Sequence, residues 1–471
     1  MISSFSAPFA RRRGAVRLAA AALVSGLAVA GVVATAGTAV ADGATPGEGG
    51  ATATIGGLET FGAAVIHEES GDLEVSAGLF EMSVEGGGTL QTYGVDLRNP
   101  TQKDAKYHET PWSGTSLGAG QDAGRVRWIL QNSYPQVNDL ASLASRAGIA
   151  GALTEQDAAA GTQVAIWRHA DGADVDAVDP QAEQLADYLQ KAARDTAEPE
   201  ASLTLDPPAV SGRPGAPLGP VTVRTDAGTV TVTPPMDAAT SGVRIVDKDG
   251  VAVTTAKNGT QLFFDVPEDA GAGTAELTVR ASTTIPVGRA FTSESRSQTQ
   301  ILAGSSESTV SATASAAWAT QGAVPALSAA KNCAEHGVDI TAANQGDEAF
   351  VFELMGAEYT IAAGASQTVT VPLEEDQAYD FTIAGPQGRQ YRFTGVLDCR
   401  TRAAETGNLT TQTLSEPSPA TVGGTSSSDT NLAETGGSSA TPIIAGTAIG
   451  LVVIGGAALV LVGRKEHAGR D

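Results

Sequence analysis

Cysteine is almost absent from this chain of 471 residues, which has only Cys333 and Cys399. The two residues form no CxxC pair, and no cluster of histidine or acidic residues at ligand spacing surrounds them, so a metal pair or a redox pair is a weak explanation. Outside the cell, two cysteines are expected to oxidise to each other. We therefore expect a Cys333–Cys399 disulfide, which would stabilise its segment by about 3–5 kcal/mol on the chain-entropy model.

Basic and aromatic side chains are also scarce. The chain has 29 basic residues against 53 acidic ones, a formal net charge of -24, and aromatics make up 5% of the sequence. Because an acidic surface repels phosphate groups, nucleic acid is disfavoured as a partner. A sequence poor in aromatics and rich in Thr, Ser, Gly and Val is typical of β-sandwiches joined by turns.

Histidine gives no sign of catalysis. Between the ends of the chain the histidines are His67, His108, His169 and His336, and none lies in a nucleophile-elbow or zinc motif. We therefore expect a protein that is not an enzyme and that has no catalytic residues, no metal and no cofactor. A secreted enzyme remains the third and least favoured class.

The N-terminus has the three parts of a secretory signal. Arg11, Arg12 and Arg13 are followed by an apolar run from Leu18 to Val33 and by the small-x-small cleavage pattern Ala39-Val40-Ala41. This order predicts a signal peptide over residues 1–41 that is removed on export. The arginines are compatible with the twin-arginine route, but nothing else supports it, so the general secretory route is favoured.

The C-terminus combines a short motif, an apolar run and a basic tip. The apolar run from Ile443 to Val462 has about 20 residues, enough for a helix to cross a bilayer core of roughly 30 Å, and Arg464 and Lys465 follow it. The motif before the run is Leu432, Ala433, Glu434, Thr435 and Gly436.

This tail resembles the cell-wall sorting signal of Gram-positive surface proteins. The resemblance implies that sortase cuts between Thr435 and Gly436 and joins the threonine carboxyl to a peptidoglycan precursor. Before sorting, the helix would hold the chain in the membrane. An ordinary single-span anchor remains the alternative, because the physical properties of the tail do not distinguish the two.

Changes in composition divide the chain into segments. After the signal peptide we expect a flexible leader, a mixed α+β head domain, two all-β immunoglobulin-like sandwiches and a Ser/Thr/Gly/Pro wall-spanning linker. The strand candidate 310–318 fits either sandwich, so the boundary between them is open. The expected boundaries are 42–54 for the leader, 55–198 for the head, 199–305 and 306–400 for the sandwiches, 401–431 for the linker and 432–471 for the sorting signal with its transmembrane helix.

One helical motif within the head stands out. Gln163 shares a helix face with Trp167, and a glutamine shielded by a large apolar side chain needs a hydrogen-bond partner. The motif Thr162-Gln163-Val164-Ala165-Ile166-Trp167, with Tyr93-Gly94-Val95-Asp96 upstream, resembles the thioester (TQXA) domain of Gram-positive surface adhesins. In that family the glutamine side chain forms a thioester with a cysteine, and a nucleophile on another surface opens the bond.

The resemblance places the family's glutamine at Gln163, with Thr162, Ala165 and Trp167 in support, and its cysteine at Gly94. Glycine carries no sulfur, so we predict a head that keeps the fold and has lost the covalent function. The favoured function is non-covalent binding of an unknown surface ligand, or a structural role, at the cell wall. The alternative is a covalent adhesin in which Gln163 bonds to a distant cysteine. Asp96 and Glu109 are either remnants of the thioester site or solvated carboxylates, and the second interpretation is favoured.

Overall fold

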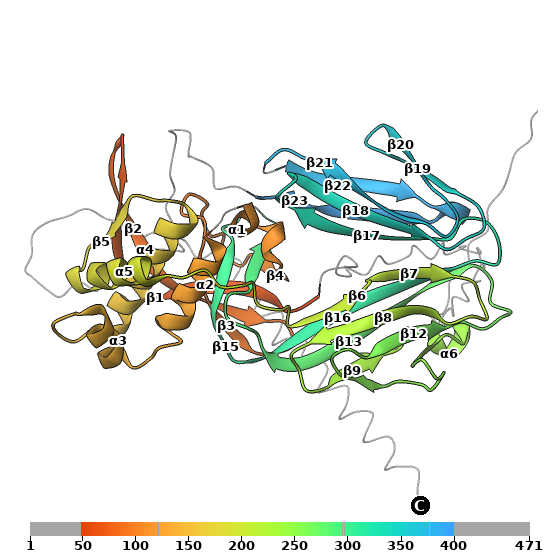
Figure 1. The fold of residues 1–471 in the computed structure, drawn as a ribbon, viewed down its shortest axis with the longest axis horizontal. Coiled ribbons are helices and arrows are strands. Elements are labelled where there is room, and N and C mark those ends of the chain that lie inside the picture. The colour runs from red at the N-terminus through yellow and green to blue at the C-terminus, as the bar shows by residue number, and fades with distance from the viewer. Residues whose placement is uncertain (1–48, 120–121, 294, 296, 376, 400–471) are drawn as a thin grey trace, which may run out of the picture. The chain divides into compact units, whose positions relative to one another are not determined.

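The computed structural model describes residues 49–399, apart from residues 120–121, 294, 296 and 376. The predicted signal peptide, the wall-spanning linker and the sorting signal lie outside the described residues, as does the apolar run 443–462. Among the residues that are described, no helix is long and apolar enough to cross a membrane. The described chain is a mostly β protein with several sheets (Figure 1).

A seven-stranded sheet forms the centre of the head, in the order β2-β3-β15-β14-β4-β1-β5. All of its pairings are antiparallel. Its longest strands, β1 and β2, form a hairpin that pairs from Ala53 opposite Val84 to Glu68 opposite Gly71. The register shifts at two places along this hairpin. The head's early strands are β1 (Thr52–Glu68), β2 (Gly71–Val84), β3 (Thr89–Gly94), β4 (Lys106–Thr110) and β5 (Val175–Ala177).

Helices cover this sheet, and local signals set their ends. Thr154 followed three residues later by Asp157 is a sequence pattern that predicts a capping box, and the structure confirms it. The side chain of Thr154 accepts a hydrogen bond from the Asp157 backbone, and the Asp157 carboxylate accepts one from the Thr154 backbone. Asp179 caps the last helix, with Pro180 at its first position. The helices are η1 (Trp112–Gly114), α1 (Ser116–Ala119), α2 (Ala123–Asn132), α3 (Leu140–Ala147), α4 (Glu155–Ala170) and α5 (Pro180–Ala192).

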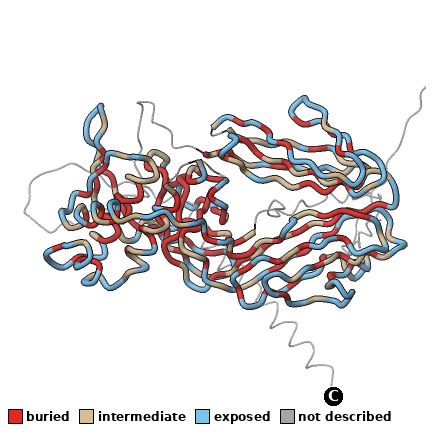
Figure 2. The backbone as a smooth tube through the Cα atoms, viewed as in Figure 1, coloured by how far each residue is buried: buried red, intermediate tan, exposed pale blue. Residues whose placement is uncertain are grey.

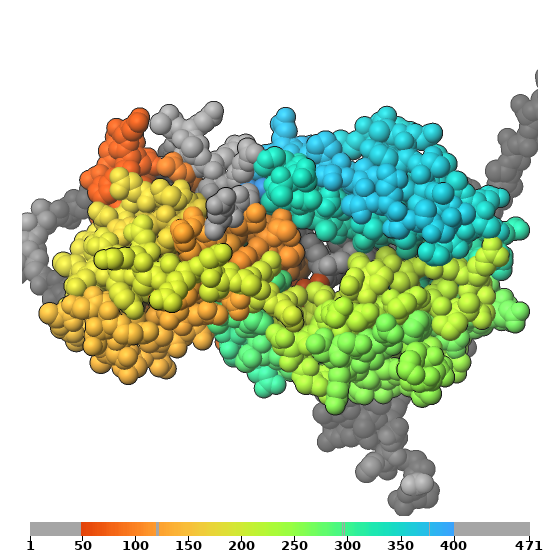
Figure 3. Space-filling view, in the orientation of Figure 1, coloured from red at the N-terminus to blue at the C-terminus, as the bar shows by residue number. Residues whose placement is uncertain are grey.

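Two strands of the head's sheet come from much later in the chain. The strands β14 (Ala290–Ser293) and β15 (Gln300–Ser305) form a hairpin that lies between β3 and β4. In Figure 1 this hairpin is green among orange strands, and in Figure 3 teal atoms lie beside the orange atoms of the head. The expected boundary of 199–305 for the first sandwich is therefore corrected, because residues 290–305 complete the head.

The leader prediction is corrected as well. Residues 52–54, which we expected to be flexible, pair with His108, Tyr107 and Lys106 of β4. Ala51 and Ala53 are buried in the hydrophobic core. The folded head therefore begins before residue 55.

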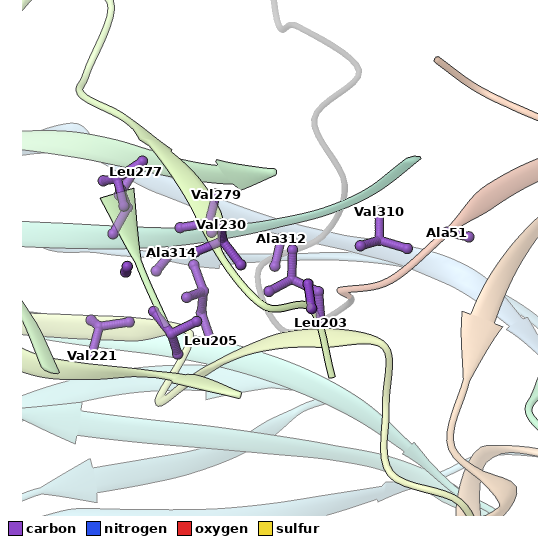
Figure 4. Close-up of a cluster of buried hydrophobic side chains, with 14 of the residues drawn as sticks. Ala51, Leu203, Leu205, Val221, Val230, Leu277, Val279, Val310, Ala312 and Ala314 are labelled. Atoms are coloured by element: carbon purple, nitrogen blue, oxygen red, sulfur yellow. The ribbon is translucent and has the colours of Figure 1, made fainter. Parts of the chain in front are cut away.

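Two sheets follow the head and face each other as a sandwich. One has the order β10-β12-β8-β6 and the other β11-β9-β13-β16-β7. Inward side chains of both sheets share one core, drawn in Figure 4 with residues such as Leu205, Val221 and Leu277. The elements are β6 (Leu203–Asp206), β7 (Ala209–Gly212), β8 (Leu218–Thr225), β9 (Val230–Thr233), α6 (Ala238–Ser241), β10 (Arg244–Val246), β11 (Thr255–Ala256), β12 (Gln261–Asp265), β13 (Gly273–Thr284) and β16 (Glu307–Trp318).

The last of these strands settles the boundary that the sequence left open. β16 pairs along its whole length with β13, from Gly273 opposite Trp318 to Thr284 opposite Glu307. It also pairs in parallel with β7. The sandwich thus ends near residue 319, and the expected start of the next unit at residue 306 is corrected.

A third unit has its own core and a disulfide. Its sheets are β17-β18-β21, β19-β20 and β22-β23, and their inward side chains form one cluster that includes Cys333 and Cys399. The predicted disulfide between these two residues is confirmed. The elements are β17 (Pro325–Asn332), β18 (Gly337–Asn344), β19 (Phe350–Leu354), β20 (Ala357–Ile361), β21 (Ser366–Pro372), β22 (Gln377–Ala384), η2 (Pro386–Gly388) and β23 (Gln390–Leu397).

The head and the sandwich share one cluster of buried hydrophobic side chains. The sandwich core continues into Ala51, Phe80 and Met82 of the head's strands. Figure 2 shows buried positions along the inner strands and exposed positions at the turns. A second core lies between the head's helices and sheet and includes Ile301 of the late hairpin.

Candidate functional site

The side chain of Gln163 is fully buried and is held by the backbone of one residue. Its Oε1 accepts a hydrogen bond from the Gly94 N–H at 3.1 Å, and its Nε2 donates to the Gly94 carbonyl oxygen at 2.7 Å. Both functions of the carboxamide are thereby used, as a buried amide requires. The structure thus brings together the end of β3 and the middle of α4, which are 69 residues apart.

The residues around Gln163 on α4 are packed on every side. Thr162, Ala165 and Trp167 are all fully buried. The Thr162 hydroxyl donates to the carbonyl oxygen of Ala158 at 2.7 Å, and α4 packs against β1, β2, α2 and α5. A helix buried in this way has little freedom to turn, so the Gln163 carboxamide is fixed in place.

Gly94 is required for space and not for an unusual backbone. Its φ does not lie in the left-handed region that favours glycine. A Cβ at this position would lie under 3.0 Å from three side-chain atoms of Gln298, namely Oε1, Cδ and Nε2. The volume in which a side chain at position 94 would begin is therefore filled by a second glutamine.

Gln298 belongs to the loop of the late hairpin and is fully buried. Its Oε1 accepts from the Thr101 hydroxyl at 3.0 Å and from Gln300 Nε2 at 3.3 Å, and its Nε2 donates to the backbone oxygen of Asp96. Its own carbonyl oxygen accepts from the Tyr107 hydroxyl at 2.9 Å. Both the oxygen and the nitrogen of the Gln298 carboxamide are therefore hydrogen-bonded, which fixes the side chain beside Gly94.

Asp96 is not the solvated carboxylate that we expected, because it is fully buried. Its Oδ1 accepts from the Ser116 hydroxyl at 2.6 Å and its Oδ2 from the Thr299 N–H at 3.0 Å. Burial raises the pKa of this carboxyl above its usual range, and these hydrogen bonds oppose the rise. Asp96 ties the loop of the late hairpin to the region after β3.

Glu109 is likewise buried, which corrects the second expectation of a solvated carboxylate. It lies on β4 and accepts from Arg289 Nε at 2.8 Å and from the Ser202 N–H at 2.9 Å. Arg289 is 3% exposed and also donates to Glu198 at 2.9 Å. This ion pair joins β4, the start of the late hairpin and the connection into the sandwich, so its role is structural.

The cysteine sulfur atoms lie outside the head. The sequence contains two cysteines, and both are bonded to each other in the third unit. Within the described part of the chain, no group of three or more His, Cys, Asp or Glu side chains is arranged to hold a metal ion. The chemistry around Gln163 is accordingly that of amides, hydroxyls and one carboxyl group.

Sequence reasoning missed Gln298 and Arg289. Neither lies in a recognisable motif, and each acts on residues far away along the chain: Gln298 is 202 residues from Asp96, and Arg289 is 180 residues from Glu109. The available signal was the polar run 292–300, which ends in Ser297-Gln298-Thr299-Gln300 directly before the apolar residues 301–303. Its amides would have been expected in solvent.

Comparisons with known families agree with the location of this site. Residues 91–195 match the family model described as the thioester domain. Residues 321–396, in the third unit, match the C-terminal domain of bacterial phospholipase C. No curated protein matches the chain.

Solved structures give more distant similarities. The Bacillus anthracis TIE protein is 17% identical with a TM-score of 0.25, over 72% of this chain, and the chain spans 63% of that protein's length. The thioester domain of the Enterococcus faecium TIE86 protein is 18% identical with a TM-score of 0.25, over 57% of this chain and 96% of that domain. Similarities at this level carry no argument about function. What the family model shows is that residues 91–195 of this mostly β, multi-sheet chain are similar to the thioester domain.

Proposed function

We propose that this protein is a secreted surface protein of the adhesin type, anchored to the cell wall, whose head acts without a thioester. It is not an enzyme. The head contacts a surface ligand reversibly or serves as a structural component, and the sandwich and the third unit, both immunoglobulin-like in this proposal, display it. Sortase and a peptidoglycan precursor are the partners in anchoring, and export leaves the protein outside the membrane.

One observation carries the proposal about the head. Gln163 has both functions of its carboxamide bonded to Gly94, at the position that the resemblance assigns to the family's cysteine. The two cysteines of the chain are consumed by their own disulfide. A thioester needs a thiol beside the carboxamide, and this supports an intact Gln163.

Peptide masses of the native protein test this directly. Trypsin releases residues 147–168, which contain Gln163, and we expect the mass of an unmodified glutamine. Treatment of the folded protein with methylamine should add nothing to this peptide. A peptide joined to Cys333 or Cys399 with the loss of one ammonia, or one that gains methylamine, would establish the covalent adhesin instead.

Anchoring is tested with the sorting motif. We expect the native protein to be released from purified cell walls by a muramidase and not by detergent. Thr435→Ala should shift the protein to the membrane fraction, whereas Thr430→Ala, just outside the motif, should leave it in the wall. Release of the native protein by detergent alone would show a single-span membrane anchor and contradict the proposal.

A further inference from the structure

Gln298 has a relation to Gly94 that neither the motif nor the family match describes. It lies outside residues 91–195, in a hairpin that the chain supplies about 100 residues after that segment ends. Its carboxamide atoms are the three atoms nearest to a Cβ built at position 94. The size of the side chain that position 94 can hold is therefore limited by Gln298, a residue that is distant in sequence and adjacent in the folded chain.

The limit is firm because Gln298 is not free to move aside. A flexible side chain at a surface could rotate away from a new Cβ at little cost. Gln298 is fully buried, and its amide is bonded to Thr101, Gln300 and the backbone of Asp96. Moving the side chain would break these hydrogen bonds, and because the site is buried, water would not supply replacements.

We propose that Gln298 and Gly94 form an exclusion pair that decides which chemistry the head's buried site can hold. A side chain at position 94 and a glutamine at position 298 compete for one volume. With Gln298 in place, the Gln163 carboxamide meets only the backbone of residue 94. With a small residue at position 298, a thiol at position 94 gains room beside Gln163 Cδ. The inference rests on the proposed function, in which the native site has no thioester.

The reaction that this opens is balanced within the chain. The sulfur introduced by Gly94→Cys attacks Gln163 Cδ and forms a C–S bond. The bond between Cδ and Nε2 breaks, and the NH2 group takes up the thiol proton and leaves as ammonia. One thiol and one carboxamide thus become one thioester and one ammonia. No oxidant, metal or second substrate is needed.

Four variants of the full chain test the pair: Gly94→Cys, Gln298→Ala, the double Gly94→Cys/Gln298→Ala, and Gly94→Cys/Gln300→Ala as the matched control. The control removes another buried carboxamide of the same cluster that is not among the nearest atoms to the new Cβ. The readouts are loss of one ammonia from the intact protein and incorporation of methylamine into residues 147–168.

We expect the double variant to form the thioester on the order of tenfold more than Gly94→Cys alone, since one unmade buried hydrogen bond shifts an equilibrium by about that factor. The control should resemble Gly94→Cys. Equal yields in Gly94→Cys and the double variant would overturn the exclusion pair while leaving the proposed function intact. Ammonia loss in the native protein would instead overturn the proposed function.

A second measurement covers a double variant that fails to fold or fails to react. Gly94→Ala adds only a Cβ, and it should lower the melting temperature more when residue 298 is glutamine than when it carries Gln298→Ala. Equal losses in the two backgrounds would show that the two positions do not compete and would overturn the inference.

Discussion

Gln163→Glu changes one atom of the buried site and tests how the carboxamide is held. The introduced carboxyl has nearly the same shape, but when ionised it has no hydrogen to donate to the Gly94 carbonyl oxygen, which now lies 2.7 Å from Nε2. The Gly94 carbonyl then loses its Gln163 donor, and a negative charge lies in a fully buried position. Both effects oppose folding at neutral pH.

The magnitude follows from these two losses. Leaving a buried hydrogen-bonding group without its partner costs about 1–3 kcal/mol. Burial also raises the pKa of the introduced carboxyl above that of the unfolded chain, and each unit of rise costs about 1.4 kcal/mol at a pH above the folded value. We therefore expect the free energy of unfolding to fall by about 3–5 kcal/mol at pH 7.

The sign of the pH dependence is the sharper test. Because the folded protein holds this proton more tightly than the unfolded chain, the variant loses stability as pH rises from about 4 through the folded pKa. At pH 4 the protonated carboxyl can donate to Gly94, so most of the loss should disappear. Urea unfolding at both values measures this, with Gln156→Glu on the exposed first turn of α4 as the control. A Gln163→Glu protein as stable as the native one at pH 7 would refute the conclusion that the carboxamide is buried and hydrogen-bonded to Gly94.

Other buried groups give three further predictions. Burial raises the pKa of Asp96, so its share of stability is largest at low pH; Asp96→Asn should gain relative to the native protein between pH 4 and pH 7 in urea unfolding, and a constant difference would contradict this. Arg289→Met leaves Glu109 buried and unpaired and should cost about 3–5 kcal/mol, much of which Arg289→Met/Glu109→Gln should restore; no rescue would show that the charge is not the cause. Reduction of the disulfide, which spans 66 residues, should destabilise the third unit by about 4 kcal/mol, and an unchanged melting transition under reductant would argue against its role.

The sequence predicted the elements that depend on neighbouring residues. The capping box at Thr154 and the start of the last helix at Asp179 and Pro180 are where the motifs placed them, because a cap is decided within one turn. The disulfide was predictable for a different reason. With two cysteines in a chain for which export was predicted, there was only one intramolecular pairing to consider.

Long-range pairing could not be read in the same way. Residues 290–305 have an ordinary strand–turn–strand pattern, which fits the sandwich that surrounds them in the sequence. Their place between β3 and β4 depends on strand edges about 180–215 residues away, and nothing local encodes such a partner. Gln298 was missed with them, because its importance comes from where the hairpin lies.

The carboxylates were misjudged because burial of a charge is rare unless a partner is present. Glu109 has that partner in Arg289, and Asp96 has Ser116 and Thr299. None of these contacts follows from the residues next to the carboxylate. The Gln163–Gly94 contact was easier to predict. A shielded amide on a helix requires a hydrogen-bond partner, and the resemblance indicated the position of that partner.

The late hairpin also limits how this head can be moved between proteins. A gene fragment that stops at residue 198 would yield a sheet split between β3 and β4, with two rows of backbone groups unsatisfied. Open edges of this kind attract strands from other molecules and promote aggregation. A fragment that is to fold as a complete head must therefore extend through residue 305 and carry most of the downstream sandwich with it.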